Sequence, residues 1–385
     1  MVGLPHPTEA GSARKMRHNR RVNAPSQHAR VDNLTAAATG ARPHRNPMWM
    51  MRQAGRSLPE YHAARGTTTM LEACLIPDLA AEITCQPVRR HDVDAAVFFS
   101  DIVVPLKLAG VGVEIQPGVG PVFDSPANDA ASIAALTAHT FDDADAISQA
   151  VSLVVRELSS RPYDTPVIAF AGAPFTLAAY LVQGRPSKDH LAARALMHAD
   201  PHAWDQLMTW CARMSAEFIL TQLRAGARVI QLFDSWVGSL SEADYRRSVM
   251  PYSAQVLAAV AAEFPEVPRI HFGVNTTHLL PAMAEAGATV IGVDHRLPLD
   301  DANRLLQGRY ALQGNLDPAL LFAGQDVLQA AARAVVDAGA HAPGHIVNLG
   351  HGVPPTCDPG VLTDLVAYVH ELPVPDRPAS SEVQA

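Results

Sequence analysis

The chain has 385 residues and a mass of 41.1 kDa, which is enough for a large core in about one to three domains. Hydrophobic residues make up 48% and charged residues 18%, the balance of a globular protein rather than a disordered one. The formal charge is −8, and the body of the chain has no basic stripe, which argues against a nucleic-acid partner. No apolar run approaches the ~20 residues that a membrane span requires.

The cysteines give no sign of a disulfide framework or of a local zinc motif. They lie far apart in the chain and form no CxxC pair, a pattern that fits a reducing compartment. The four are Cys74, Cys85, Cys211 and Cys357.

The two ends differ in composition from the rest of the chain. Residues 1–46 carry eight Lys or Arg against two acidic residues and show no apolar periodicity, so we expect a disordered basic extension there. An Arg-rich transit peptide is the alternative, although no amphipathic helix is visible. Residues 373–385 are rich in Pro and Ser and are expected to form a flexible tail. The folded domain is therefore predicted over 47–372.

Between these ends, short β-branched runs alternate with longer Ala- and Leu-rich stretches of helical period. The runs predict eight strands, in chain order Met48–Met51, Ala95–Phe99, Pro166–Ala171, Arg228–Phe233, Arg269–Val274, Thr289–Val293, Tyr310–Gln313 and His345–Leu349. The clearest helices are predicted over Ser187–Ala225, Ser241–Phe264, Thr277–Ala286 and Pro318–Ala338.

A long series of β-then-α units predicts parallel strands, and eight of them can close into a (β/α)₈ barrel, also called a TIM barrel. The alternative is an open, doubly wound sheet. No Gly-rich G-x-G-x-x-G turn follows any of the strands, which disfavours that alternative. The glycine-punctuated stretch Val111–Phe123 is interpreted as a hairpin inserted in a βα loop.

Polar side chains follow the predicted strands. In a parallel barrel the carboxyl ends of the strands share one face, and active sites form there, so residues far apart in sequence are expected to line one cleft. The residues concerned include Arg52, Gln53, Arg56, Ser100, Asp101, Thr176, Tyr180, Asp234, Ser235, Asn275, Asp294, His295, Asn315, Asn348 and His351.

Each candidate also has a purely structural interpretation. Asp101 and Ser235 could be helix N-caps, although no acidic residue stands three positions after Asp101. Arg52 and Arg56 have the spacing of a solvated helix face, yet they flank a glycine in an apolar setting. Tyr180 lies among aliphatic residues and could be an ordinary core residue.

His351 is harder to explain as a core residue, because the glycines on both sides of it indicate a close approach of the backbone to another group. A Cys357/His351 nucleophile pair is conceivable but has no orienting signature. The chain has no G-x-x-x-x-G-K-[ST], H-E-x-x-H or G-x-S-x-G motif, and no His/Cys group with metal-ligand spacing, so we expect no metal site. Arginines that face a cleft instead indicate an anionic substrate, bound through carboxylate or phosphate groups.

Six segments resemble signature regions of the uroporphyrinogen decarboxylase family, in the family's order. The resemblance implies a single (β/α)₈ barrel, usually a homodimer in the cytoplasm, that needs neither cofactor nor metal. It also implies decarboxylation of the four acetate side chains of uroporphyrinogen III to methyl groups, which gives coproporphyrinogen III. The segments are Pro47–Tyr61, Phe98–Ile102, Ile168–Gly184, Gln231–Ser241, Leu312–Pro318 and Asn348–Pro354.

The resemblance also implies which residues act. Asp101 matches the aspartate that receives the pyrrole NH groups, and with Arg52 and His351 it forms the expected catalytic set. Two positions depart from the family pattern: Ser57 replaces an aromatic residue, and His295 stands where many members have Trp. The expected substrate contacts are Arg52, Gln53, Arg56, Arg65, Asp101, Tyr180, Ser235 and His351.

The chemistry requires an acceptor for the electron pair left by carbon dioxide, and protonation of the ring carbon creates it. Asp101 is suited to stabilising the resulting cation. Two proton donors stay open at this point: Arg52 matches by position but is a poor acid, whereas His351 has a better-matched pKa. A related class of zinc methyltransferases carries His-x-Cys near the fifth strand, where this chain has His271-Phe272-Gly273, and a tetrapyrrole carrier is a non-enzymatic alternative.

Overall fold

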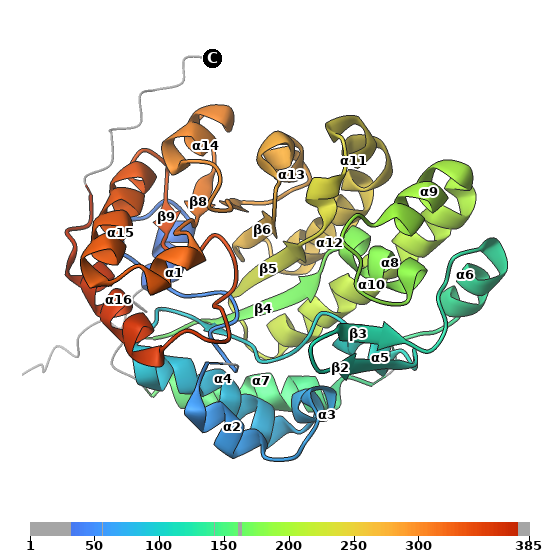
Figure 1. Cartoon of the computed structure of the whole chain (residues 1–385), viewed down its shortest axis with the longest axis horizontal. Coiled ribbons are helices and arrows are strands. Elements are labelled where there is room, and N and C mark those ends of the chain that lie inside the picture. The colour runs from blue at the N-terminus through green and yellow to red at the C-terminus, as the bar shows by residue number, and fades with distance from the viewer. Residues whose placement is uncertain (1–31, 56, 142, 161–163, 376–385) are drawn as a thin grey trace, which may run out of the picture. The chain divides into compact units, whose positions relative to one another are not determined.

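The fold is known from a computed structural model that describes residues 32–55, 57–141, 143–160 and 164–375. Seven parallel strands form one curled sheet, in the order β1-β4-β5-β6-β7-β8-β9, with helices around its outside (Figure 1). Most strand residues are buried, as expected for a parallel sheet with one face on helices and the other inside a barrel. The strands are β1 (Ala96–Val97), β4 (Val167–Gly172), β5 (Val229–Asp234), β6 (Arg269–Gly273), β7 (Val290–Gly292), β8 (Ala311–Gln313) and β9 (His345–Ile346).

The chain around Met48 occupies the eighth strand position, between β9 and β1. Met48 pairs in parallel with Val347, and the Val347 N–H donates to the Pro47 carbonyl at 2.9 Å. On the other side, the Asp94 N–H donates to the Met48 carbonyl at 2.8 Å. The predicted strand Met48–Met51 is thus reduced to a bridge, and the predicted (β/α)₈ architecture is confirmed as a TIM-barrel-like fold.

A buried polar chain crosses the inside of this barrel. The Trp49 indole donates to Gln313 Oε1 at 3.0 Å, and the Gln313 amide donates to Gln231 Oε1 at 2.8 Å. The three side chains come from the Met48 segment, β8 and β5, and all are buried. The barrel interior is therefore packed with side chains, as in other barrels of this type, and leaves binding to the strand ends.

Helices follow most strands and cover the outer face of the sheet (Figure 1). Their bounds are α1 (Asn33–Ala38), α2 (Pro59–Arg65), α3 (Met70–Leu75), α4 (Pro77–His91), α5 (Val104–Leu108), α6 (Ala130–Thr137), α7 (Asp145–Leu158), α8 (Pro174–Gln183), α9 (Leu191–Ala199), α10 (Pro201–Arg224), α11 (Glu242–Ser248), α12 (Met250–Glu263), α13 (Leu280–Glu285), α14 (Leu299–Leu305), α15 (Gln325–Gly339) and α16 (Pro359–Glu371). Short 3₁₀ turns add η1 (Val237–Ser239), η2 (Thr277–Leu279) and η3 (Pro318–Phe322).

Prolines divide the long helices that the sequence predicts. The stretch Ser187–Ala225 becomes α9 and α10, because Asp200 accepts from the Ala203 N–H at 3.0 Å and Pro201 opens a new helix. The stretch Ser241–Phe264 likewise becomes α11 and α12, with Pro251 in the first turn of α12. The predicted hairpin over Val111–Phe123 is confirmed as β2 (Val113–Gln116) paired with β3 (Gly120–Phe123).

The folded unit begins earlier than the predicted boundary at Pro47. Helix α1 is capped by Asp32, whose carboxylate accepts from the Thr35 N–H at 2.7 Å. Leu34 and Ala37 are fully buried, and the helix packs against β8 and β9. The prediction that all of 1–46 is disordered is therefore wrong for residues 32–46. Residues 1–31 lie outside the described part of the chain, as do residues 376–385 of the predicted tail.

Candidate active site

A large hollow lies at the carboxyl ends of the Met48 segment, β1, β4 and β5. It holds about 1430 Å³ of space not filled by atoms, including open solvent at its mouth. Residues from four separate parts of the chain share its wall, as the barrel geometry predicts. Of the polar residues predicted to lie after the strands, those that line it are Arg52, Ser100, Asp101, Thr176, Tyr180 and Ser235.

Arg52 is held in the hollow by an unusual backbone and a close neighbour. Its φ is 62°, in the left-handed region that a side chain such as Arg rarely adopts, and such conformations gather at functional sites. A Cβ added to Gly352 would lie within 3 Å of Arg52 Cγ and Cδ. The glycine after His351 is therefore required for the close approach that the sequence indicates, and the group that approaches is Arg52.

Gln53 supports the loop that carries Arg52 and is not among the residues that line the hollow. Its side chain is fully buried, donates to the Ala95 carbonyl at 2.8 Å and accepts from the Met50 N–H at 2.9 Å. Both ends of the amide are thus engaged by backbone groups. The amide therefore has a structural role next to Arg52, and a substrate contact by Gln53 stays a prediction.

Asp101 follows β1 and faces the hollow. Its Oδ1 accepts from the Val103 N–H at 3.0 Å in the turn before α5, but the N-cap of that helix is Val103, so the interpretation of Asp101 as a helix N-cap is wrong. The carboxylate also acts on a buried thiol behind it: burial, and then the charge of Asp101, raise the pKa of Cys74 well above its usual range. Cys74 therefore stays a neutral thiol, and the carboxylate is held by the turn while it lines the cavity.

Tyr180, from α8, lies near both of these charged groups. Burial raises the pKa of its phenol well above 10, the Asp101 charge adds to that effect, and the Arg52 charge opposes it. The hydroxyl therefore stays protonated and can donate a hydrogen bond. Its ring lies against Trp236, with ring centroids 3.9 Å apart, next to Ser235 on the loop after β5.

His351 and Arg65 lie beyond the residues that line the hollow, and Arg56 lies outside the described residues. The pKa of His351 is lowered by partial burial first and then by the charge of Arg52, so its neutral form is favoured and it lies close to that guanidinium. Arg65 packs its guanidinium over the ring of Tyr61, 5.4 Å from the centroid, and donates to the Thr68 carbonyl at 2.7 Å. Tyr61 lines the hollow, whereas Arg65 does not.

The rest of the wall is apolar, and the sequence reasoning did not assign it a function. Two of its contributors are the hairpin β2–β3, which lies beside α5 (Figure 1), and the loop after α8, where Pro186 contacts Gly120. The signal available in the sequence was the dense aromatic content of the strand ends. The main apolar residues are Tyr61, Phe98, Phe99, Ile115, Val119, Pro121, Phe170, Pro186, Phe233 and Trp236.

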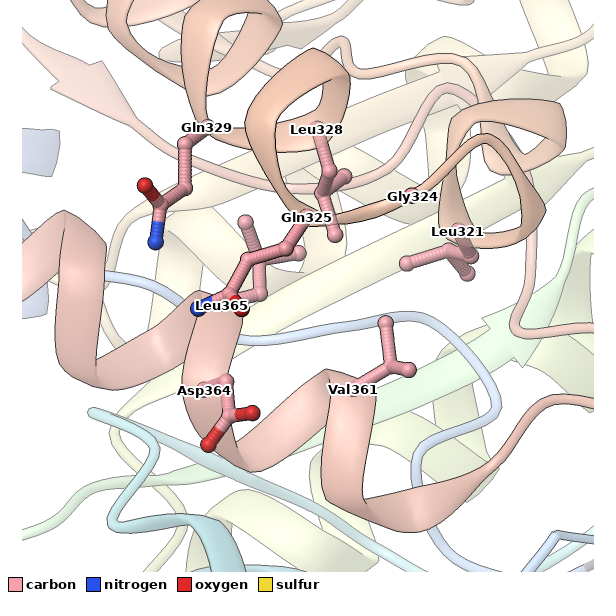
Figure 2. A pocket seen from close by; sticks show the side chains of 8 residues that line it. All are labelled: Leu321, Gly324, Gln325, Leu328, Gln329, Val361, Asp364 and Leu365. Carbon is pink, nitrogen blue, oxygen red and sulfur yellow. The ribbon is translucent and has the colours of Figure 1, made fainter.

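A second hollow lies on the outer surface between η3, α15 and α16 (Figure 2). It is smaller, at about 460 Å³, and Asp364 is its one ionisable lining residue. It lacks arginine and every predicted site residue. Its lining is Leu321, Gly324, Gln325, Leu328, Gln329, Val361, Asp364 and Leu365.

The described residues contain no group of three or more His, Cys, Asp or Glu side chains arranged to hold a metal ion. Near the fifth strand, the buried His271 ring instead lies 3.6 Å from Asp234 Oδ2. Among the same residues, no helix combines the length and apolar character needed to cross a bilayer.

Comparison with known proteins shows the family of this chain. Residues 30–372 match the family described as uroporphyrinogen decarboxylase (URO-D). A protein named uroporphyrinogen decarboxylase from Arthrobacter sp. (strain FB24) is 57% identical over 88% of this chain and 96% of its own length, and one from Streptomyces avermitilis is 55% identical over 85% and 90%. Among solved structures, a methyltransferase from Methanosarcina mazei superposes with a TM-score of 0.70 at 17% identity, over 88% of this chain and 97% of that one, which shows a shared fold. The chain belongs to the uroporphyrinogen decarboxylase family.

Proposed function

We propose that the chain decarboxylates the four acetate side chains of uroporphyrinogen III to methyl groups, giving coproporphyrinogen III in porphyrin and haem biosynthesis. The observation that carries this proposal is the placement of Asp101, Arg52 and Tyr180 around one hollow. The relatives at more than 50% identity support the reaction class. The hollow supplies a cationic group for the substrate's carboxylates and a carboxylate for its pyrrole NH groups.

The mechanism begins with the formation of a cation on the pyrrole ring. A proton adds to the ring carbon next to the one that bears the acetate, and the ring becomes positively charged. The carbon–carbon bond to the carboxylate then breaks, carbon dioxide leaves, and the electron pair forms an exocyclic methylene. Protonation of that methylene and loss of the ring proton give the methyl group, so each acetate consumes one proton in total.

Asp101 lowers the barrier if it stabilises this cation more than the neutral pyrrole. At ~4 Å and an effective dielectric of ~20, the attraction between a carboxylate and a unit positive charge is ~4 kcal/mol. That energy corresponds to roughly a 10³-fold increase in rate. The hydrogen bond from the Val103 N–H fixes the carboxylate in advance, so little reorganisation is needed during the reaction.

The arginine and the hydroxyls have a second role, which is to bind and orient. Arg52 is placed to bind a substrate carboxylate through its planar guanidinium. Tyr180 and Ser235, which also line the hollow, can donate hydrogen bonds to side-chain carboxylates of the substrate. Holding the acetate so that its scissile bond stands against the ring plane is a proximity and orientation effect. We propose the same binding role for Arg56.

Two groups are candidates for the proton donor, and pH dependence separates them. Arg52 lines the hollow but is a very weak acid, whereas the lowered pKa of His351 makes its protonated form scarce at neutral pH. If His351 donates, His351→Gln should abolish the fall of kcat/KM as pH rises through the histidine range. If that limb of the profile survives in the variant, Arg52 or water is the donor.

The experiment that tests the function is anaerobic incubation of the purified protein with reduced uroporphyrinogen III, with products separated by their number of carboxylates. Stepwise loss of carboxylates down to coproporphyrinogen supports the proposal. Tight binding without conversion would identify a tetrapyrrole carrier instead. We further propose a cytoplasmic homodimer, as the family resemblance implies, and light scattering of the purified chain tests the dimer.

A further inference from the structure

Three aromatic rings form a stack at one wall of the active-site hollow. The ring of Tyr180, from α8, lies 3.9 Å from that of Trp236, with an angle of 37° between the planes. On its other side, Trp236 stacks against His190, from the turn before α9, at 4.3 Å and 14°. Tyr180 and Trp236 line the hollow, and His190 does not. The indole is therefore clamped between a ring at the site and a ring behind it.

His190 is a rigid backing for this stack. Only 5% of its surface is exposed, and its φ of 52° lies in the left-handed region. Its N–H donates to Ser187 Oγ at 3.2 Å, and its ring meets Phe175 edge-on at 6.4 Å. Burial lowers the pKa of His190 to about 4, which keeps the imidazole neutral and able to stack as an apolar plate.

The Tyr180 side chain depends on this stack for its orientation. Within the described part of the chain, its hydroxyl makes no hydrogen bond to another residue, although the phenol stays protonated beside Asp101 and Arg52. A tyrosine at a binding site is commonly held through its hydroxyl by a neighbouring polar group. Here the ring face is held instead, and the hydroxyl is left for a ligand.

We propose that Trp236, backed by His190, is a positioning residue that sets the Tyr180 hydroxyl against the substrate's side chains. The part of this inference that concerns the substrate rests on the proposed function. The stack itself does not, because its geometry is present without a ligand. Aromatic pairs of this kind carry enough energy to change a rate by up to about tenfold when one ring is lost.

A double-mutant cycle tests the coupling. Trp236→Leu and Tyr180→Phe should each lower kcat/KM, by about tenfold for the tryptophan variant, and the double variant should be no worse than Tyr180→Phe alone. Trp236→Phe keeps a ring between Tyr180 and His190 and should restore most of the activity. Trp204→Phe is the control, because Trp204 contacts Phe175 but does not line the hollow. Effects that multiply in the double variant would overturn the proposal.

A measurement without substrate separates this inference from the proposed function. Two aromatic rings 3.9 Å apart couple electronically, so the circular dichroism of the folded protein should contain a Trp236–Tyr180 signal. Removal of either ring should remove that whole signal, and the double variant should add no further change; Trp204→Phe should leave it intact. If the protein does not decarboxylate uroporphyrinogen but each single change removes the whole signal, the proposed function is wrong and the Trp236–Tyr180 stack is supported. If turnover is found and the two single changes are additive in the spectrum, the stack is wrong.

Should Trp236→Leu fail to fold, His190→Leu approaches the stack from the other side. It keeps Trp236 and Tyr180 but removes the stacked imidazole, so kcat/KM should fall by less than it does in Tyr180→Phe. An unchanged kcat/KM in folded His190→Leu would contradict the proposed backing role.

Discussion

Residues that follow the strands have different roles in the two halves of the barrel. Along the Met48 segment, β1, β4 and β5, the residues after the strands turn their side chains into the hollow: Arg52, Asp101 and Ser235 are examples. Along β6 to β9, several of the corresponding residues bond to backbone groups or to a neighbouring side chain. Asp294 accepts from the Asn275 N–H at 2.6 Å and pairs with Arg296 at 2.9 Å.

The same holds at the remaining strand ends of the second half. The Asn315 amide donates to the Asp294 and Leu297 carbonyls at 2.8 and 2.6 Å, and Asn348 Oδ1 accepts from the Met51 N–H at 3.2 Å. The difference teaches that a polar residue after a barrel strand is not by itself a binding residue. Its function depends on whether neighbouring loops already satisfy its hydrogen-bonding groups.

The largest expected effect is that of Asp101→Asn, in the first half. The variant keeps the size and one acceptor oxygen but loses the charge, so it should bind substrate and turn over roughly 10³-fold more slowly. Single-turnover decarboxylation measured together with a binding titration checks this. Turnover at the parent rate would remove the cation-stabilising role of Asp101.

Gly352→Ala tests how the second half supports the first. The new Cβ would collide with the Arg52 side chain, and overpacking of this kind displaces the neighbour, so we expect kcat/KM to fall roughly tenfold. Gly360→Ala is a suitable control, because a Cβ there meets only the Asp358 side chain at the start of α16. Equal kinetics in the two variants would show that Arg52 does not depend on the loop that carries His351.

Asn315→Ala should affect stability instead of catalysis. It leaves two carbonyls without their donor, in a residue that is only 7% exposed, which costs about 1–3 kcal/mol of unfolding free energy. Urea unfolding measures that loss, and kcat/KM of the folded variant should stay within about twofold of the parent. A large kinetic defect with unchanged stability would place Asn315 in the substrate site and break the contrast between the two halves.

A separate effect, on stability alone, concerns pH and three buried histidines. Burial lowers the pKa of His91, His190 and His345 to about 4 each, against 6.5 as their ordinary value. Between these pKa values the unfolded chain binds protons that the folded chain does not bind. The contribution of these histidines to the free energy of unfolding is therefore fully present above about pH 6.5 and falls as the pH drops toward 4. The loss is on the order of 2 kcal/mol per histidine at pH 5. Unfolding free energies at pH 7.5 and 5 should differ less in His91→Asn than in the parent; an equal difference would contradict a buried, neutral His91.

Much of the fold was predictable because the spacing of apolar residues along the chain follows which side chains are buried. Seven of the eight predicted strands are present as strands, and the eighth is the bridge at Met48. The errors in the predicted helices have local causes that the spacing of apolar residues does not show. Pro201 restarts a helix where the apolar period continues, and α1 is too short for its period to show before Pro47.

The lining of the hollow was predictable where a motif and a strand end coincide, as at Asp101, Tyr180 and Ser235. Gln53 belongs to the same motif as Arg52, yet its side-chain amide is hydrogen-bonded to backbone groups, which only the folded structure shows. Trp236 and His190 were missed for a related reason: their stack joins separate loops, and no spacing in the sequence records it.

The most direct test of the account is a crystal structure with coproporphyrinogen III bound under anaerobic conditions. The account predicts the macrocycle in the hollow between the hairpin β2–β3 and the loop after β5, with its pyrrole NH groups donating to the Asp101 carboxylate. A macrocycle seated over the ends of β6 to β9, or with no pyrrole nitrogen within hydrogen-bonding distance of Asp101, would contradict it.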